Sequence, residues 1–393
     1  MGKRISKRVQ RKLMVVIILL LWFSNYIYVP VLSTYSSSVG ASLTMVGLIL
    51  SSYGLAQMLL RIPFGLLSDI LENRRLFLYL GLFASLISSL CFYFFTSSGM
   101  LLLARALAGV AVSNWAIFVT TYGALDEKDD SSRSIGIINS LMALGQILGV
   151  FFGGIIAQYL NVKWTFTISI LASFIGLVLL FFIDETYESM GEKVKLSSFI
   201  LVAKDTKLLF YSMMALLLQA ISTSSLTGFV PTLLNNINAS DFEKGLGTTL
   251  AILPATFAAP LAVGFLRRQL GAKWTAIAGF AILSITMFFF PIIISTPLML
   301  GILFIAGCGR GLLLPLFMAQ SVAHLPSETR STALSAFQAI YGVGMWIGPA
   351  ITGFISNHFS LGIAFISLSI IGFAAILCLL LYKDNEKKCQ PSV

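Results

Sequence analysis

The sequence contains an internal repeat in which short motifs recur about two hundred residues apart. No single match is specific, but three matches in the same order at a nearly constant spacing predict a chain built from two similar halves. The matching segments are residues 28–32 (YVPVL) and 229–233 (FVPTL), residues 65–67 (GLL) and 264–266 (GFL), and the pairs Arg133-Ser134 and Arg330-Ser331, which are followed by Gly145 and Gly342.

Each half is too hydrophobic to fold as a water-soluble domain. Hydrophobic residues make up 57% of the chain and charged residues 11%, whereas a soluble domain carries about 25% charged residues. A helix of about 20 apolar residues crosses the hydrocarbon core of a bilayer. Stretches of this kind cover residues 14–35, 43–71, 76–95, 100–125, 134–159, 164–183, 208–235, 246–266, 274–293, 298–323, 331–356 and 361–382.

We therefore expect an all-α integral membrane protein with twelve transmembrane helices in two six-helix bundles. Six crossings return the chain to its starting side, so the two bundles run parallel and are related by an axis along the membrane normal. The expected units are an N-terminal bundle over residues 1–183, an inter-bundle loop over residues 184–207, and a C-terminal bundle with a short tail over residues 208–393.

The basic residues indicate the orientation in the membrane. Of 26 lysines and arginines, 21 fall on one side under this topology, Lys163 and Lys244 fall on the other, and Arg61, Arg105 and Arg310 lie within helices. This asymmetry predicts that both termini are cytoplasmic in a plasma-membrane protein. The net charge of +10 is then a topology signal and requires no nucleic acid partner.

A polar turn joins the second and third predicted helices at residues 65–75 (GLLSDILENRR). With Gly47, Tyr53, Gly54, Gln57 and Pro63 before it, this segment resembles the major facilitator superfamily, especially its drug:proton antiporter branch. Gly65, Asp69 and Arg74 fit the branch pattern, whereas Ile70, Glu72 and Asn73 depart from it. Gly65 would allow two helices to approach closely, and Arg74 can pair with carboxylates such as Asp126. We expect Gly65, Asp69, Arg74 and Asp126 to form a cytoplasmic gate.

Residues 105–109 (RALAG) begin the fourth predicted helix and are similar to the family motif Arg-x-x-Gln-Gly, with Ala108 in place of Gln. The resemblance implies a part in proton coupling for Arg105. An arginine whose side chain extends outward to the membrane interface is an equal alternative, because Arg105 lies only about five residues inside the predicted span.

Glycines recur at spacings that favour close helix crossing. Gly145, Gly149 and Gly153 lie on one face of the fifth predicted helix, and Gly344 and Gly348 lie on the eleventh. They are similar to the antiporter glycine motif, although its Gly-Pro is Gly149-Val150 in this chain.

The family resemblance puts helices one, four, seven and ten around a substrate cavity. Arg310 stands at the middle of helix ten, where a charge costs about 2.5–3.5 kcal/mol, and it should face water, a polar residue or an anionic ligand. At about 100° per residue, polar and aromatic side chains share single faces of the predicted helices one, seven and eleven. The candidate cavity residues are Trp22, Asn25, Tyr28, Arg105, Gln219, Thr223, Arg310, Gln338 and Tyr341.

All 16 acidic residues lie outside the centres of the predicted helices. Drug:proton antiporters usually keep a carboxylate within the bundle to carry the proton, and this sequence departs from that pattern. Proton coupling could use Asp69 or Asp126 at the inner mouth, or transport could proceed without it.

Two matching halves in a membrane protein indicate an alternating-access transporter. We expect it to move small organic molecules across the plasma membrane, by efflux, and the resemblance implies an antiporter. An organic-anion carrier that binds substrate with Arg310 and Arg105 is the alternative. An integral-membrane enzyme is a remote third possibility, because the sequence has no catalytic motif and no metal-ligand spacing. We expect no catalytic residue, no metal, no cofactor and a monomer in the bilayer.

Overall fold

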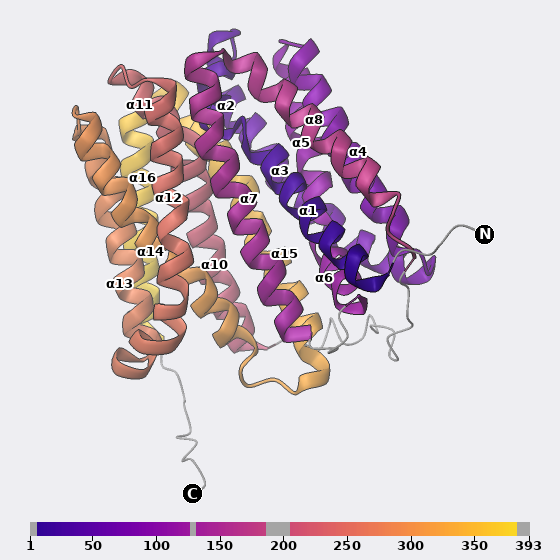
Figure 1. Ribbon diagram of the computed structural model, residues 1–393. Coiled ribbons are helices and arrows are strands. Elements are labelled where there is room, and N and C mark those ends of the chain that lie inside the picture. The colour runs from indigo at the N-terminus through magenta and orange to yellow at the C-terminus, as the bar shows by residue number, and fades with distance from the viewer. Residues whose placement is uncertain (1–5, 126–130, 186–204, 383–393) are drawn as a thin grey trace, which may run out of the picture.

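The computed structural model describes residues 6–125, 131–185 and 205–382, which form a bundle of long helices with no strand among them (Figure 1). The predicted all-helical membrane architecture is confirmed. Of the expected inter-bundle loop, residues 186–204 lie outside the described part of the chain.

The two halves present the same series of helices. The first half contains α1 (Lys7–Tyr26), α2 (Val29–Ser38), α3 (Leu43–Ile70), α4 (Arg74–Phe94), α5 (Ser98–Ser113), α6 (Trp115–Ala124), α7 (Ser131–Tyr159) and α8 (Val162–Leu180). The second half contains α10 (Thr206–Ser224), the π-helical turn η1 (Ser225–Phe229), α11 (Val230–Asn236), α12 (Asp241–Leu261), η2 (Ala262–Leu266), α13 (Arg267–Phe289), η3 (Phe290–Ile292), α14 (Thr296–Val322), α15 (Ser327–His358) and α16 (Leu361–Leu381).

The first helix of each half is interrupted at the same place. The helix α1 ends at Tyr26 and α2 begins at Val29 with Pro30 in its first turn, and η1 separates α10 from α11, which has Pro231 in its first turn. Proline lacks the N–H that would bond to the preceding turn, so it favours a break at this point. These interruptions coincide with the first repeated motif, residues 28–32 and 229–233.

Eleven helical segments in the described residues are long and apolar enough to cross a membrane. The helix α12 is not among them, although it occupies the eighth position in the predicted series. It begins with Asp241, Glu243 and Lys244, and these charges lower its mean hydropathy. Counting α12, the series of long helices matches the twelve that the sequence predicts.

The described ends of the chain lie on one face of the molecule, which we name the terminal face. Here Gln10 of α1 bonds to Asp184 beyond α8, with 2.8 Å from Nε2 to Oδ2. In the second half, the Nζ of Lys273 near the start of α13 donates to the carbonyl oxygens of Leu380 and Tyr382 at the end of α16. The α2–α3, α7–α8 and α11–α12 turns lie at the opposite end of the helices, which we name the distal face (Figure 1).

Candidate functional site

The two halves touch mainly along two helix pairs, α3 with α15 and α7 with α12, and α2 also contacts η1, α11 and α12. Near the distal face, both pairs cross at glycines. A Cβ on Gly47 of α3 would lie 2.8 Å from the Cα of Gly353 of α15, and a Cβ on Gly154 of α7 would lie 2.6 Å from the Cα of Gly245 of α12. Gly245 and Gly353 follow Gly47 and Gly154 by about two hundred positions each. The repeat therefore relates the Gly47–Gly353 crossing to the Gly154–Gly245 crossing, as a pseudo-twofold axis between the halves requires.

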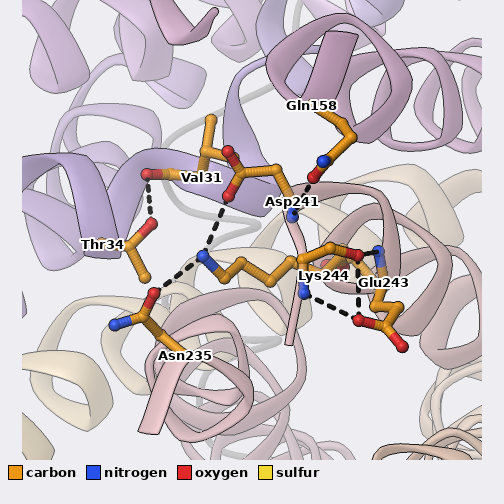
Figure 2. A network of polar contacts seen from close by, with 9 residues as sticks. Val31, Thr34, Gln158, Asn235, Asp241, Glu243 and Lys244 are labelled. Atoms are coloured by element: carbon orange, nitrogen blue, oxygen red, sulfur yellow. Dashed lines mark hydrogen bonds and ion pairs between the residues drawn. The ribbon is translucent and has the colours of Figure 1, made fainter. Parts of the chain in front are cut away.

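A polar network covers the α7–α12 crossing at the distal face (Figure 2). The backbone N–H of Asp241 donates to Oε1 of Gln158 at 3.0 Å, which joins the second half to the first. Lys244, 5% exposed, donates to Asp241 and Asn235 at 2.9 and 2.8 Å. Ser240 and Glu243 form a capping box at the start of α12. The distal face is thus closed by packing and by hydrogen bonds.

The terminal face lacks the corresponding close contacts at its repeated glycines. A Cβ added to Gly65 of α3 or to Gly264 of η2 would meet nothing within 4 Å. The expected close approach of helices at Gly65 is therefore absent in this arrangement.

The polar residues of the expected cytoplasmic gate lie at the α3–α4 turn. Asp69 is exposed near the end of α3, and the buried Arg74 at the start of α4 attracts its carboxylate. Asn73, a departure from the family pattern, caps α4 by accepting the Leu76 N–H at 2.8 Å. Asp126 lies outside the described residues.

The predicted helix-crossing glycines lie at contacts within each half. Cβ atoms on Gly145 and Gly149 would stand 2.9 and 3.0 Å from atoms of α1, and one on Gly153 would meet the carbonyl of Ile27, directly after α1. In the second half, a Cβ on Gly344 would meet the Leu216 carbonyl of α10, and one on Gly348 would stand 2.7 Å from Ala220 of α10. These glycines let α7 pack closely on α1 and α15 on α10. The helices α7 and α15 also contact the other half, through α12 and α3.

Arg105 lies in a buried aromatic pocket of the first half. Its guanidinium carbon stands 4.2 Å from the ring centroid of Tyr53 and 5.7 Å from that of Tyr28, distances at which a cation interacts with an aromatic face. Its Nη1 also donates to the Tyr28 hydroxyl at 3.3 Å and to the Asn25 carbonyl at 3.5 Å. The side chain is 6% exposed, so the outward-extended alternative is excluded. The helix α5 begins at Ser98, which puts Arg105 deeper than the sequence suggested.

Arg310 stands at the middle of α14 and differs from Arg105 in its surroundings. It is half-buried and has no hydrogen-bond or ion-pair partner among the described residues, and its electrostatic neighbour is Tyr26 of α1 in the opposite half. Tyr26 also interacts with Tyr53. The two tyrosines thus connect Arg310 with the Arg105 pocket across the boundary between the halves.

Gln338 and Tyr341 lie at the α3–α15 contact. Both accept hydrogen bonds from Nη1 of Arg61, at 2.5 Å to Oε1 of Gln338 and 3.2 Å to the Tyr341 hydroxyl. A pocket between α3 and α15 is lined by these three residues together with Gln57 and Met58. The structure brings Arg61 to this pair, which the sequence did not indicate.

The remaining candidate cavity residues pack inside their own halves. The Asn25 amide donates to the Leu21 carbonyl and to Ser85 at 2.8 and 3.0 Å, and Trp22 packs against Gly145. In α10, Gln219 accepts from Ser222 through Oε1 and its carbonyl accepts from Thr223. Asn25 and Trp22 are almost fully buried, so their side chains support the first bundle in this arrangement.

Sequence reasoning missed Tyr26 as a candidate residue, and it assigned no crossing to Gly154, Gly245 or Gly353. The repeat contained the signal for the glycines, because both crossings join positions that the repeat relates. No sequence signal identified Tyr26, since its neighbour Arg310 belongs to the other half.

The comparisons with known proteins agree with this architecture. The family model described as Major Facilitator Superfamily matches residues 14–213 and 212–392. The chain is 23% identical over 357 residues to the proton-coupled antiporter flippase LtaA of Staphylococcus saprophyticus, covering 88% of this chain and 87% of that protein. It is 26% identical over 260 residues to a multi-drug resistance efflux pump PmrA homolog of Lactococcus lactis, covering 64% of this chain and 63% of that protein. The crystal structure of the nucleoside transporter NupG (D323A mutant) superposes with a TM-score of 0.78 at 13% identity, over 95% of this chain and 99% of that one. This chain belongs to the major facilitator superfamily of membrane transporters.

Proposed function

We propose that this protein is an alternating-access exporter of small amphipathic organic molecules. The observation that carries the proposal is the contrast between the two faces. Glycine crossings close the distal face, whereas the repeated glycines Gly65 and Gly264 of the terminal face have no close neighbours. Two bundles that touch at the distal face and along α3 and α15, but not at the repeated glycines of the terminal face, can rock about those contacts and expose a central site to each side in turn.

The excess of basic residues in the loops and termini on the terminal face supports a cytoplasmic position for that face. With this orientation, the arrangement of the helices is inward-facing. The reciprocal closure would bring Gly65 and Gly264 into contact with the opposite half and would separate Gly154 from Gly245. In this proposal Asp69 and Arg74 stabilise the closed cytoplasmic side.

Efflux is the direction supported by the relatives, since one is named an antiporter flippase and another an efflux pump. The central side chains fit an amphipathic substrate. Arg310 supplies a charge at the midpoint of α14, while the half-buried Tyr26 of α1 supplies an aromatic ring, which packs 6.2 Å from the ring of the buried Trp22. Aromatic side chains with a few polar groups are typical of sites for flat organic ligands.

The proposal is tested with purified protein in phosphatidylcholine vesicles. The probes are three fluorescent molecules with one NBD-labelled dodecyl chain that ends in a carboxylate, a carboxamide or an ammonium group. We expect protein-dependent movement of at least one probe, and counterflow when unlabelled probe is placed on the opposite side. Movement no faster than in protein-free vesicles for all three probes would contradict the proposal. Repeating the assay with an imposed pH gradient tests the expected antiport with protons.

A further inference from the structure

The helix interiors contain arginines without acidic partners. The chain has 16 acidic residues, and in the described helices each carboxylate stands at or near a helix end, from Asp69 in the last turn of α3 to Asp241 and Glu243 in the first turn of α12. Arg61, Arg105 and Arg310 lie well inside α3, α5 and α14. The middle of the bundle therefore carries positive charge that no described side chain neutralises.

The three arginines differ in how their charge is accommodated. Arg61 donates to Gln338 and Tyr341. Arg105 is stacked on Tyr53 and almost fully buried, so a ligand cannot reach it without rearrangement. Arg310 is half-buried and has no hydrogen-bond partner among the described residues.

The exposed part of Arg310 does not face lipid. On α14, Phe304 and Ile305 are exposed large apolar side chains, as expected of a lipid-facing stripe. At about 100° per residue, Arg310 lies about 240° and 140° around the helix from them, on the opposite side. Its electrostatic neighbour is Tyr26 of α1, which belongs to the other half. Arg310 consequently faces the space between the halves.

We propose that Arg310 binds an anionic group of the substrate, a carboxylate or a phosphate, between α14 and α1, with Tyr26 beside it. This inference rests on the proposed transport function and assigns it a substrate class, amphipathic organic anions. A guanidinium offers paired N–H donors that match a carboxylate or a phosphate. A charged group within a bundle finds a partner or a water-filled space, and a substrate anion would supply the partner. Arg105 acts as a positioning residue, because it holds Tyr53 and, through it, Tyr26.

The three NBD probes test this inference because they differ only in charge. We expect the wild-type protein to move the carboxylate probe about tenfold faster than the carboxamide, or more, as for a hydrogen bond to a charged group. Arg310→Gln should reduce this ratio by a similar factor, and Arg310→Lys should preserve part of it. Arg61→Gln removes another arginine from the helix interior and should keep the ratio even if the rate falls.

Each outcome separates the inference from the proposed function. Equal movement of carboxylate and carboxamide, a preference for the ammonium probe, or an unchanged ratio in Arg310→Gln overturns the inference and leaves the transporter standing. If Arg310→Gln fails to fold, the carboxylate-to-carboxamide rate ratio of the wild type alone tests the anion site. If no probe moves, the effect of each probe on the unfolding temperature of the purified protein tests it instead. The carboxylate probe should raise its unfolding temperature more than the carboxamide does, and the absence of that difference overturns the anion site.

The anionic group could belong to a membrane lipid or to a soluble molecule. A second pair of probes, NBD-labelled phosphatidylglycerol and NBD-labelled phosphatidylcholine, distinguishes the two sources. Faster protein-dependent flipping of the phosphatidylglycerol identifies a lipid headgroup as the ligand. Movement of the single-chain carboxylate without flipping of either lipid identifies a soluble amphiphile.

Discussion

Replacement of Gly154 by alanine should shift the protein from the distally closed arrangement toward the distally open one. The new Cβ would lie 2.6 Å from the Cα of Gly245, whereas carbon atoms pack best at about 3.5–4.0 Å. The helices α7 and α12 must then separate by about 1 Å at their crossing. Overpacking of this kind costs about 1–3 kcal/mol, which corresponds to a shift of about 5- to 150-fold in the equilibrium between the two arrangements.

Distances between spin labels measure this shift. Labels on Tyr159→Cys and Ile294→Cys, both exposed, report the separation of the halves at the distal face. Labels on Ile70→Cys and Leu381→Cys report it at the terminal face. We expect longer distances in the first pair and shorter distances in the second when Gly154 is alanine. The native cysteines Cys91, Cys308, Cys378 and Cys389 are replaced by serine in all variants.

Gly301→Ala is the matched control, because a Cβ on Gly301 of α14 would meet nothing within 4 Å. This control also replaces a helical glycine by alanine, but the added methyl group does not contact the other half. Distal distances in Gly154→Ala that coincide with those in Gly301→Ala would refute the glycine-crossing argument. Gly47→Ala, at the equivalent crossing, should reproduce the effect of Gly154→Ala.

Three further predictions concern other parts of the protein. Burial raises the pKa of Asp205, but hydrogen bonds from the Leu208 N–H and from His324 outweigh this effect and hold the pKa below the ordinary 3.8. The ionised carboxylate therefore stabilises the folded protein fully above pH 3.8, and this stabilisation is lost as the pH falls through the lowered pKa. Over this acidic range, the unfolding temperature of Asp205→Asn should therefore fall less than that of the wild type. If the two plots of unfolding temperature against pH were parallel, the stabilising role of the Asp205 carboxylate would be contradicted. Arg105→Lys should lower the free energy of unfolding in detergent by about 2 kcal/mol, because lysine cannot stack as a plane on Tyr53; equal denaturant midpoints would exclude this. A potential of 100 mV, positive at the distal face, should favour movement of the carboxylate probe toward that face by about 50-fold, since each charge gains about 2.3 kcal/mol, and an unaltered distribution would exclude transport as a net anion.

Periodicity located the helices well but failed where the first helix is interrupted. The span predicted over residues 208–235 agrees closely with the α10–η1–α11 segment, Thr206 to Asn236. Trp22, Asn25 and Tyr28 were assigned to one face on the assumption of a continuous helix. Because α1 ends at Tyr26, the rotation of about 100° per residue does not extend to Tyr28, whose ring packs on Phe92 at 4.8 Å within the first half.

Contacts between the halves could be predicted only where the repeat specifies them. The crossing of Gly154 with Gly245 follows from that of Gly47 with Gly353 once the symmetry is known. The neighbours of Arg61 and Arg310 do not follow, since each depends on how one helix of the first half meets one helix of the second. A periodic pattern states which residues share a face, but it does not state what that face meets.

The repeat also separates the residues that permit movement from those that recognise the substrate. The crossing glycines recur in both halves, as Gly47 and Gly154 correspond to Gly245 and Gly353. The arginines do not recur at the offset of 199 positions that relates Gly154 to Gly353, because Phe304 stands 199 positions after Arg105 and Ala111 stands 199 positions before Arg310. A symmetric set of crossings suits rocking, which must close each face by equivalent contacts, whereas a ligand with one charged end requires an asymmetric site. Substitutions at the glycines should thus change the spin-label distances without altering the carboxylate-to-carboxamide ratio, and substitution of Arg310 should do the reverse.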